Sequence, residues 1–243
     1  MSASTSPPPR FKPNRALIKV SGAGLGSDNP LDPDSIEFIL ERVRVALDMG
    51  IEVALVIGGG NILRGAEQKI LDRTAGDMAG MMATVVNGIV LKDGLQESGT
   101  SVLLQSALPV ERVAEPVNVD RAESYLEDGG VVIFAGGTGN PYFTTDSAAA
   151  LRAGEIGADL ILKGTDVAGV YSRDPARGEA RFLSEVTYRE ITEGELGVID
   201  LTAANICRKT GIPMIVYDLF KKGNTRAALN GEEIGTYVYS EAK

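Results

Sequence analysis

The chain has 243 residues, of which 44% are hydrophobic and 23% are charged, and its formal net charge is −9. It contains no histidine and a single cysteine, Cys207, which excludes histidine-dependent hydrolysis, histidine-ligated metals and a disulfide framework. The acidic balance argues against a nucleic-acid partner, which normally needs a basic surface. We expect no membrane-spanning segment, and the lone cysteine suits a reducing, cytoplasmic location.

Residues 1–14 are rich in serine and proline and lack the apolar segment of a signal peptide. We therefore expect a flexible tail over residues 1–14, followed by a single domain over residues 15–243. The strands expected in that domain cover residues 16–21, 51–57, 101–106, 131–135, 160–165 and 212–219. The expected helices run from 33 to the glycine at 50, from 75 onward, and over 119–127, 146–157 and 201–210.

Hydrophobic spacing supports these helices, because apolar residues recur every three or four positions. The long helix is predicted to carry one apolar face, made of Met78, Met81, Met82, Val85 and Ile89. Serial strand–helix units indicate an open, mostly parallel sheet between two layers of helices. Residues 167–195 break the pattern and are interpreted as an excursion from the sheet.

Two lysines lie near the ends of expected strands, where open parallel sheets bind their ligands. Lys19 is followed by Ser21-Gly22, and Lys163 is followed by Gly164-Thr165. A lysine within a buried strand is costly unless its ammonium reaches a partner. Taken alone, either lysine is explained as well by an edge-strand residue that faces water as by a ligand-binding residue. Two on separate strands are harder to explain in this way.

A glycine-rich turn, Gly58-Gly59-Gly60-Asn61, follows the second strand and allows the backbone to approach a ligand closely. Its spacing matches neither the Walker loop nor the dinucleotide fingerprint, and a plain tight turn is the alternative. Arg64 beyond it is either a ligand or a surface charge. Asp77 either complements a helix dipole or accepts hydrogen bonds from ribose hydroxyls.

Residues 138–146 provide the most informative motif, Thr-Gly-Asn-Pro-Tyr-Phe-Thr-Thr-Asp, directly after an expected buried strand. Its glycine, hydroxyls, amide and aromatic rings suit a nucleotide better than a bare phosphate. Tyr171 either packs on an adenine or covers the core, and Asp174-Pro175 also reads as a turn. Together the motifs indicate phosphoryl transfer between two bound substrates, with Mg²⁺ neutralising the donor phosphates.

These motifs, in this order, resemble the bacterial uridylate kinases of the amino-acid-kinase superfamily. The resemblance runs from about Arg15 to Val238 and implies an αβα sandwich that converts ATP and UMP to ADP and UDP in pyrimidine nucleotide biosynthesis. It also implies a cytoplasmic homohexamer that UTP inhibits. Mg²⁺ would enter with the ATP phosphates, without a metal site made by the protein alone.

The resemblance also assigns residues to each substrate. The expected catalytic residues are Lys19, Lys163, Asp146 and Arg64. The expected ATP-binding residues are Lys19, Val20, Ser21, Gly22, Gly60, Arg64, Thr165, Tyr171 and Asp174. The expected UMP-binding residues are Gly59, Asp77, Thr138, Gly139, Asn140, Pro141, Tyr142, Phe143, Thr144 and Thr145.

Two other functions fit parts of the pattern. A kinase of this superfamily that phosphorylates a carboxylate has no need of the Tyr142-Phe143 loop. A nucleotide-binding regulatory protein without turnover has no need of Lys19 and Lys163, because such charges stabilise a transition state.

We predict that GTP has a weak effect on the rate or none. Ala23 replaces the glutamate that commonly follows the Lys-x-Ser-Gly motif, and Lys92 and Gln96 stand where responsive members tend to carry Arg and His. Initial rates measured with and without GTP test this, and a several-fold stimulation would refute it.

Overall fold

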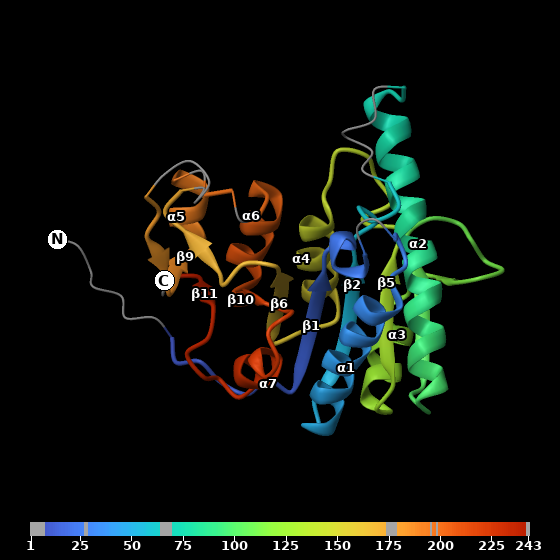
Figure 1. The fold of residues 1–243 in the computed structure, drawn as a ribbon, viewed down its shortest axis with the longest axis horizontal. Coiled ribbons are helices and arrows are strands. Elements are labelled where there is room, and N and C mark those ends of the chain that lie inside the picture. Colours follow the sequence, from blue (N-terminus) through green and yellow to red (C-terminus); the bar gives the residue numbers. More distant parts are fainter. Residues whose placement is uncertain are drawn as a thin grey trace.

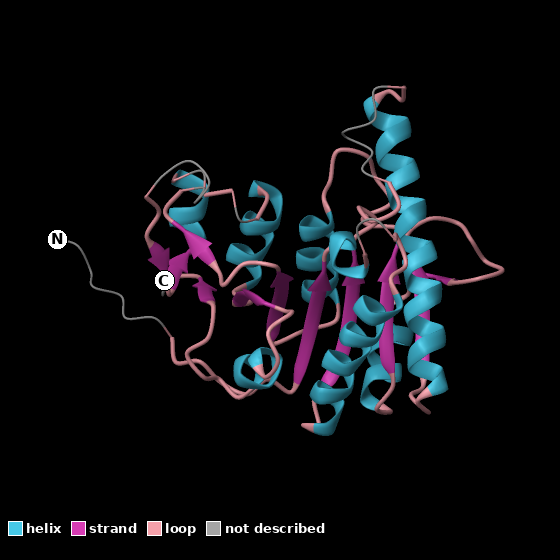
Figure 2. Cartoon of the chain, viewed as in Figure 1, coloured by secondary structure: helices cyan, strands magenta, loops and turns pink. Residues whose placement is uncertain are grey.

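The computed structural model describes residues 8–26, 29–63, 70–173, 179–194, 196–197 and 199–241. Within these residues, nine strands form one sheet in the order β4-β3-β5-β2-β1-β6-β10-β11-β9, and β7 pairs separately with β8. The strand pairs from β4 to β10 are all parallel, whereas β11 runs antiparallel to β10. Figure 2 shows this sheet in magenta between the cyan helices.

The elements have the following bounds. The strands are β1 (Arg15–Val20), β2 (Glu52–Ile57), β3 (Val102–Ser106), β4 (Glu115–Pro116), β5 (Val131–Ala135), β6 (Leu160–Thr165), β7 (Val170–Tyr171), β8 (Phe182–Leu183), β9 (Glu185–Thr187), β10 (Met214–Asp218) and β11 (Thr236–Tyr239). The helices are α1 (Pro33–Asp48), α2 (Arg73–Glu97), α3 (Val119–Glu127), α4 (Thr145–Glu155), α5 (Tyr188–Glu193), α6 (Leu201–Thr210) and α7 (Asn224–Leu229), and a short 3₁₀ helix, η1 (Gly22–Leu25), follows β1.

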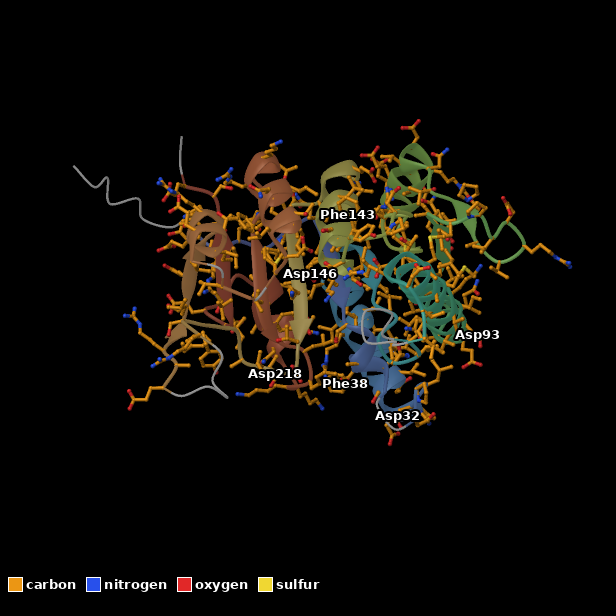
Figure 3. The ribbon with its side chains drawn as sticks, turned by 90° about the horizontal axis from the view of Figure 1, so that it is seen from above. Asp32, Phe38, Asp93, Phe143, Asp146 and Asp218 are labelled. Carbon is orange, nitrogen blue, oxygen red and sulfur yellow. The ribbon has the colours of Figure 1, made fainter. Side chains whose placement is uncertain are left out.

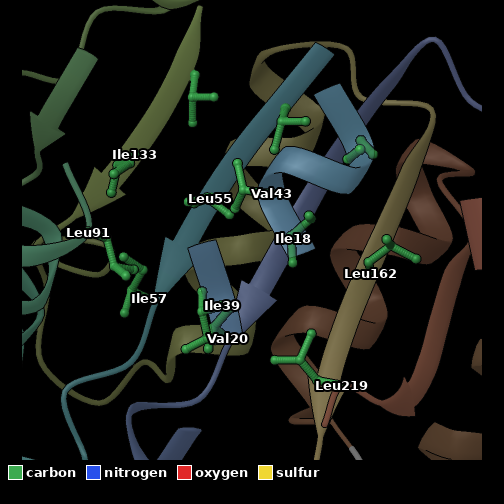
Figure 4. Close-up of a cluster of buried hydrophobic side chains, with 14 of the residues drawn as sticks. Ile18, Val20, Ile39, Val43, Leu55, Ile57, Leu91, Ile133, Leu162 and Leu219 are labelled. Carbon is green, nitrogen blue, oxygen red and sulfur yellow. The ribbon is translucent and has the colours of Figure 1, made fainter. Parts of the chain in front are cut away.

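Helices cover both faces of the sheet, and each interface holds a hydrophobic core (Figure 1). On one face, α1 and α2 contribute Ile39 and Leu91 to a cluster with the strand residues Ile18 and Leu55 (Figure 4). Leu229 of α7 belongs to the same cluster. The helices α3 to α6 pack on the other face in a second cluster. Successive strand residues point to opposite faces, so both faces demand apolar residues. The predicted three-layer fold is therefore confirmed.

Several predicted boundaries agree with the structure, including those of α3, β6 and α6. Helix α1 begins as predicted, because the Asp32 carboxylate accepts a hydrogen bond from the Ser35 amide at 2.8 Å. Helix α2 begins at Arg73, two residues before the predicted start. The reason is a cap by Asp72, which accepts a hydrogen bond from the Ala75 amide at 2.9 Å.

The prediction that residues 167–195 leave the sheet is wrong in part. Strand β9 pairs in parallel with β11 and extends the main sheet by one strand. Helix α5 follows directly, and it begins with a capping box in which Thr187 and Glu190 satisfy each other's backbone amides. Only the β7–β8 pair lies outside the main sheet among the described residues of this region.

The single apolar face predicted for α2 is also wrong in part. Met81 and Val85 are buried, and Val85 packs in the core against the sheet. Met78, Met82 and Ile89 are instead about 40% exposed (38%, 43% and 41%) on another side of the helix. By length and hydropathy alone α2 is able to cross a membrane, contrary to our expectation. Its inner side contacts β3 and β5, as a core helix of a folded domain does.

The expected tail, residues 1–14, is described only from Pro8 onward. The Arg10 guanidinium donates hydrogen bonds to the backbone carbonyls of Glu232, Ile234 and Ser184 at 3.1, 2.8 and 3.1 Å. Residues around Arg10 thus pack against the loop before β11.

Candidate active site

Lys19 and Lys163 lie side by side near the carboxyl ends of β1 and β6, where they occupy the same register position. Because their neighbours Ile18, Val20 and Leu162 face the α1–α2 layer, both lysines face the opposite layer, which contains α4. Both side chains are buried, with 9% and 7% exposure.

Asp146 lies between these two ammonium groups. It stands in the first turn of α4, at the end of the loop that also carries Phe143 (Figure 3). Its Oδ1 is 3.0 Å from Lys19 Nζ, and its Oδ2 accepts a hydrogen bond from Lys163 Nζ. We call Lys19, Lys163 and Asp146 the charge triad. A buried carboxylate with two cationic partners satisfies the rule that buried charges must be paired.

Burial and ion pairing act in opposite directions on the charge triad. Burial alone would raise the pKa of Asp146, but the ammonium groups of Lys19 and Lys163 outweigh it and hold that pKa below its ordinary value. Burial lowers the pKa of Lys163, and the Asp146 carboxylate opposes this shift without cancelling it. The charge triad thus places two lysine side chains and one carboxylate beneath the strand tips, and lysines in such a position suit a transferring phosphoryl group.

The exits of β1 and β2 pack so closely that only glycine fits. A Cβ atom on Gly22 would lie 2.2 Å from the Gly60 nitrogen, and one on Gly58 would lie 2.7 Å from the Gly22 nitrogen. A Cβ atom on Gly59 would lie 2.5 Å from the Gly80 carbonyl oxygen of α2. The glycines bring two backbone turns and α2 together, and backbone amides of such turns bind phosphates.

Asn87, which the sequence analysis missed, fixes the glycine turn to α2. This fully buried side chain donates hydrogen bonds to the Gly58 carbonyl at 2.7 Å and to Asn61 Oδ1 at 2.8 Å. Its own Oδ1 accepts a hydrogen bond from Asn61 Nδ2 at 3.0 Å. An asparagine on the inner side of a helix is the sequence signal that would have identified it.

A cavity of about 380 Å³ opens beside the glycine turn, between α2 and the loop before α4. Six of the residues expected to bind UMP line it: Gly59, Asp77, Thr138, Phe143, Thr144 and Thr145. Gly60, Arg73 and Thr84 also contribute to the wall. The Thr84 hydroxyl accepts a hydrogen bond from the Gly136 amide at 2.7 Å, which anchors the start of the loop.

The remaining residues expected to bind UMP belong to the same loop. Asn140 makes its hydrogen bonds to Thr138, through both its backbone and its side chain, so this part of the loop is held by its own residues. Tyr142 is 68% exposed and has a positive φ of 71°. Gly139 precedes Asn140 in this loop, and Pro141 separates Asn140 from Tyr142.

Asp200 is a second residue that the sequence analysis missed. Its carboxylate accepts hydrogen bonds from the hydroxyls of Thr144 and Ser147, the latter at 2.8 and 3.0 Å. It also caps α6 by accepting from the Ala203 amide at 2.9 Å. These contacts join the starts of α4 and α6. From the sequence, an aspartate directly before a helix predicts only a helix cap and not the hydrogen bonds to α4.

The residues expected to bind ATP are spread along the same edge of the sheet. Val20 is buried in the core at the end of β1, and Ser21 precedes η1. The Thr165 hydroxyl donates to the Val167 and Tyr217 carbonyls at 2.8 and 3.2 Å. The Tyr171 ring meets that of Phe182 edge-on, with centroids 5.6 Å apart. Arg64 and Asp174 lie outside the described residues.

No cluster of three or more histidine, cysteine, aspartate or glutamate side chains able to hold a metal occurs in the described part of the chain.

Replacing Asp146→Asn should lower the free energy of unfolding at pH 7 by about 3–5 kcal/mol, because two buried ammonium groups lose their counter-charge. The pKa of Asp146 is lowered, so its contribution to stability is complete above the ordinary value of 3.8 and is lost as the pH falls below it. In urea unfolding experiments between pH 7 and pH 3, the free energy of unfolding should therefore decrease less steeply with falling pH in the variant than in the wild type.

Asp120→Asn is the matched control, because Asp120 stands in the first turn of α3 but is exposed. It should follow the wild type at every pH. Parallel pH profiles for Asp146→Asn and the wild type would contradict the charge triad.

Comparisons with known proteins agree with this geometry. A profile described as the amino acid kinase family matches residues 14–218. The chain is 46% identical to the chloroplastic uridylate kinase PUMPKIN of Arabidopsis thaliana, over 96% of this chain and 70% of that protein. It is 45% identical to the uridylate kinase of Magnetococcus marinus, over 92% of this chain and 95% of that protein.

A solved structure is also similar. The UMP kinase of Bacillus anthracis superposes with a TM-score of 0.91 at 34% sequence identity, over 95% of this chain and 97% of that one. The chain therefore belongs to the amino acid kinase family and, within it, resembles the uridylate kinases over nearly its whole length.

Proposed function

We propose that the protein transfers the γ-phosphoryl group of ATP to UMP, giving ADP and UDP. The observation that carries this proposal is the charge triad, which lies beside a cavity lined by Asp77, Thr138 and residues 143–145. Relatives that are named uridylate kinase support the choice of UMP as the acceptor.

In this reaction an oxygen of the UMP phosphate attacks the γ-phosphorus as its bond to the ADP leaving group breaks. Lys19 and Lys163 stabilise the negative charge spread over the phosphoryl oxygens in transit, and Asp146 orients the two ammonium groups. A charge about 4 Å away contributes about 4 kcal/mol at an effective dielectric near 20. Mg²⁺, bound to the ATP phosphates, supplies further neutralisation.

The substrates take opposite sides of the charge triad in this proposal. UMP occupies the cavity, with Asp77 at the ribose and Thr138 through Thr145 around the base. ATP lies over the exits of β1 and β6, where Ser21, Gly22 and Gly60 offer backbone amides near its phosphates. Thr165, Tyr171 and Asp174 serve its nucleoside, and Arg64 holds phosphate between the substrates.

The wider role is pyrimidine nucleotide biosynthesis in the cytoplasm, with UTP as a feedback inhibitor. Because UTP and UMP share base and ribose, the same cavity explains how the end product competes with the acceptor.

The direct test is phosphate transfer from ATP to a panel of nucleoside monophosphates and to acetylglutamate, followed as ADP release. UMP should be the preferred acceptor. Preferential phosphorylation of the carboxylate substrate, or no ADP release with any acceptor, would contradict the proposal.

Lys19→Ala should lower kcat by about 10²–10³, by analogy with the loss of one preorganised donor to a developing charge. Steady-state kinetics with saturating ATP and UMP measure this effect. Lys209→Ala is the control, since Lys209 is an exposed lysine in the last turn of α6 and should leave kcat unchanged. An unchanged kcat for Lys19→Ala would remove Lys19 from the mechanism.

We also propose that the protein is a homohexamer. An apolar stripe on the outer side of α2 supports self-association: Met78, Met82, Val86 and Ile89 recur three or four residues apart and are each about 40% exposed (38%, 43%, 41% and 41%). Exposed apolar stripes of this kind are typical of protein–protein contacts.

Met82→Glu should therefore yield a smaller species in sedimentation analysis, because a carboxylate would be buried in the contact. Leu201→Glu provides the control, as Leu201 is 53% exposed on α6, in the other helical layer. An unchanged mass for Met82→Glu would exclude this stripe as a contact between subunits.

A further inference from the structure

Asp77 receives two hydrogen bonds on one carboxylate oxygen. Arg73 Nε, one helical turn earlier on α2, donates to Asp77 Oδ2 at 2.7 Å. The backbone amide of Tyr142 donates to the same oxygen at 2.8 Å. Among the described residues, no hydrogen bond reaches Oδ1, although a carboxylate oxygen accepts two. One oxygen is thus fixed by the protein, and the other is available to a ligand.

Tyr142 adopts a backbone conformation that needs external support. Its φ of 71° is the only positive φ of a non-glycine residue in the described part of the chain. A side chain in this region is unfavourable because its Cβ crowds the following carbonyl. The ring is 68% exposed, so core packing does not hold it in place.

Arg73 supplies part of that support. Its guanidinium carbon lies 5.6 Å from the centroid of the Tyr142 ring, in the arrangement of a cation–π contact. Arg73 therefore contacts both Asp77 and Tyr142, which are joined to each other by the hydrogen bond from the Tyr142 amide. We call Arg73, Asp77 and Tyr142 the latch.

All of the latch lies at the cavity beside the charge triad. Arg73 and Asp77 both line it, together with Thr138 and Phe143 from the loop that contains Tyr142. Burial alone would raise the pKa of Asp77, but the hydrogen bonds from Arg73 and Tyr142 hold that pKa below its ordinary value. The carboxylate is therefore ionised and accepts hydrogen bonds only.

We propose that Arg73 is a positioning residue that sets the specificity for a ribonucleotide acceptor. It holds Asp77 with Oδ1 turned to the vicinal hydroxyls of the ribose, and it holds the Tyr142 segment over the base. This proposal rests on the proposed function, because it takes UMP as the ligand of the cavity. Arg73 acts through Asp77 rather than on the phosphoryl group in transit.

The test compares UMP with dUMP, which lacks the 2′-hydroxyl, in the wild type and in Arg73→Met. We expect the KM for UMP to rise about tenfold, as for the loss of one charge-assisted hydrogen bond, with kcat within about twofold. The KM for ATP should not change. The preference for UMP over dUMP should fall towards unity, because Asp77 no longer presents Oδ1 in a fixed orientation.

Arg189→Met is the matched control. Arg189 also pairs with a carboxylate one turn away, Glu193, through Nε at 2.8 Å, but it lies on α5 and does not line the cavity. It should match the wild type with both acceptors. Melting curves of the two variants compare the stability effect of losing an exposed ion pair.

The double variant Arg73→Met with Asp77→Asn separates positioning from direct contact. Because Arg73 acts through Asp77, the double variant should be no worse than Asp77→Asn alone in its KM for UMP. Additive effects, or an equal loss for UMP and dUMP in Arg73→Met, would show that Arg73 binds the phosphate itself and would overturn the proposal. A large fall in kcat with an unchanged KM would overturn it too.

Different results would contradict the proposed function and the role of the latch. If the wild type releases no ADP with UMP, the proposed function is wrong. If the wild type phosphorylates UMP but Arg73→Met behaves like Arg189→Met, the proposed function stands and the latch is wrong.

Discussion

The burial of three charges beneath the strand tips is the constraint on which the rest of this structure depends. Lys19 and Lys163 occupy one register position of two adjacent strands, so their like charges repel across the sheet. Only a carboxylate between them makes that arrangement tolerable, and Asp146 lies close to both ammonium groups. Because Asp146 must lie between the two lysines, the position of the first turn of α4 is fixed, and so is the end of the loop that precedes it.

That loop ties the charge triad to the neighbouring cavity by chain connectivity. Thr138 and residues 143–145 of the loop line the cavity, and the next residue is Asp146. Thr144 caps α4 with its hydroxyl and donates to Asp200 at the start of α6. The loop, the start of α4 and the start of α6 are therefore parts of one hydrogen-bonded structural unit.

The sequence was sufficient where the signal is local or periodic. The apolar neighbours of Lys19 and Lys163 indicated that either lysine, if buried, needs a partner, and apolar runs between turn residues predicted the order of the central elements. It was insufficient for β9, which has only three residues and pairs with β11 some fifty positions later. Asn87 and Asp200 were missed because their partners lie on other elements, which sequence spacing does not reveal.

The latch illustrates why local signals and long-range contacts must be combined. Arg73 and Asp77 form an i,i+4 pair that, on an exposed helix, would stabilise the fold by only a few tenths of a kcal/mol. Here Asp77 of the same pair also accepts a hydrogen bond from the backbone amide of Tyr142, which lies 65 residues further along the chain. The backbone strain at Tyr142 persists because α2 and the loop constrain it together. Relaxing the strained backbone of Tyr142 would cost only its exposed contacts with Arg73 and Asp77. The strain is therefore better explained by a role in selecting a ligand than by a contribution to stability.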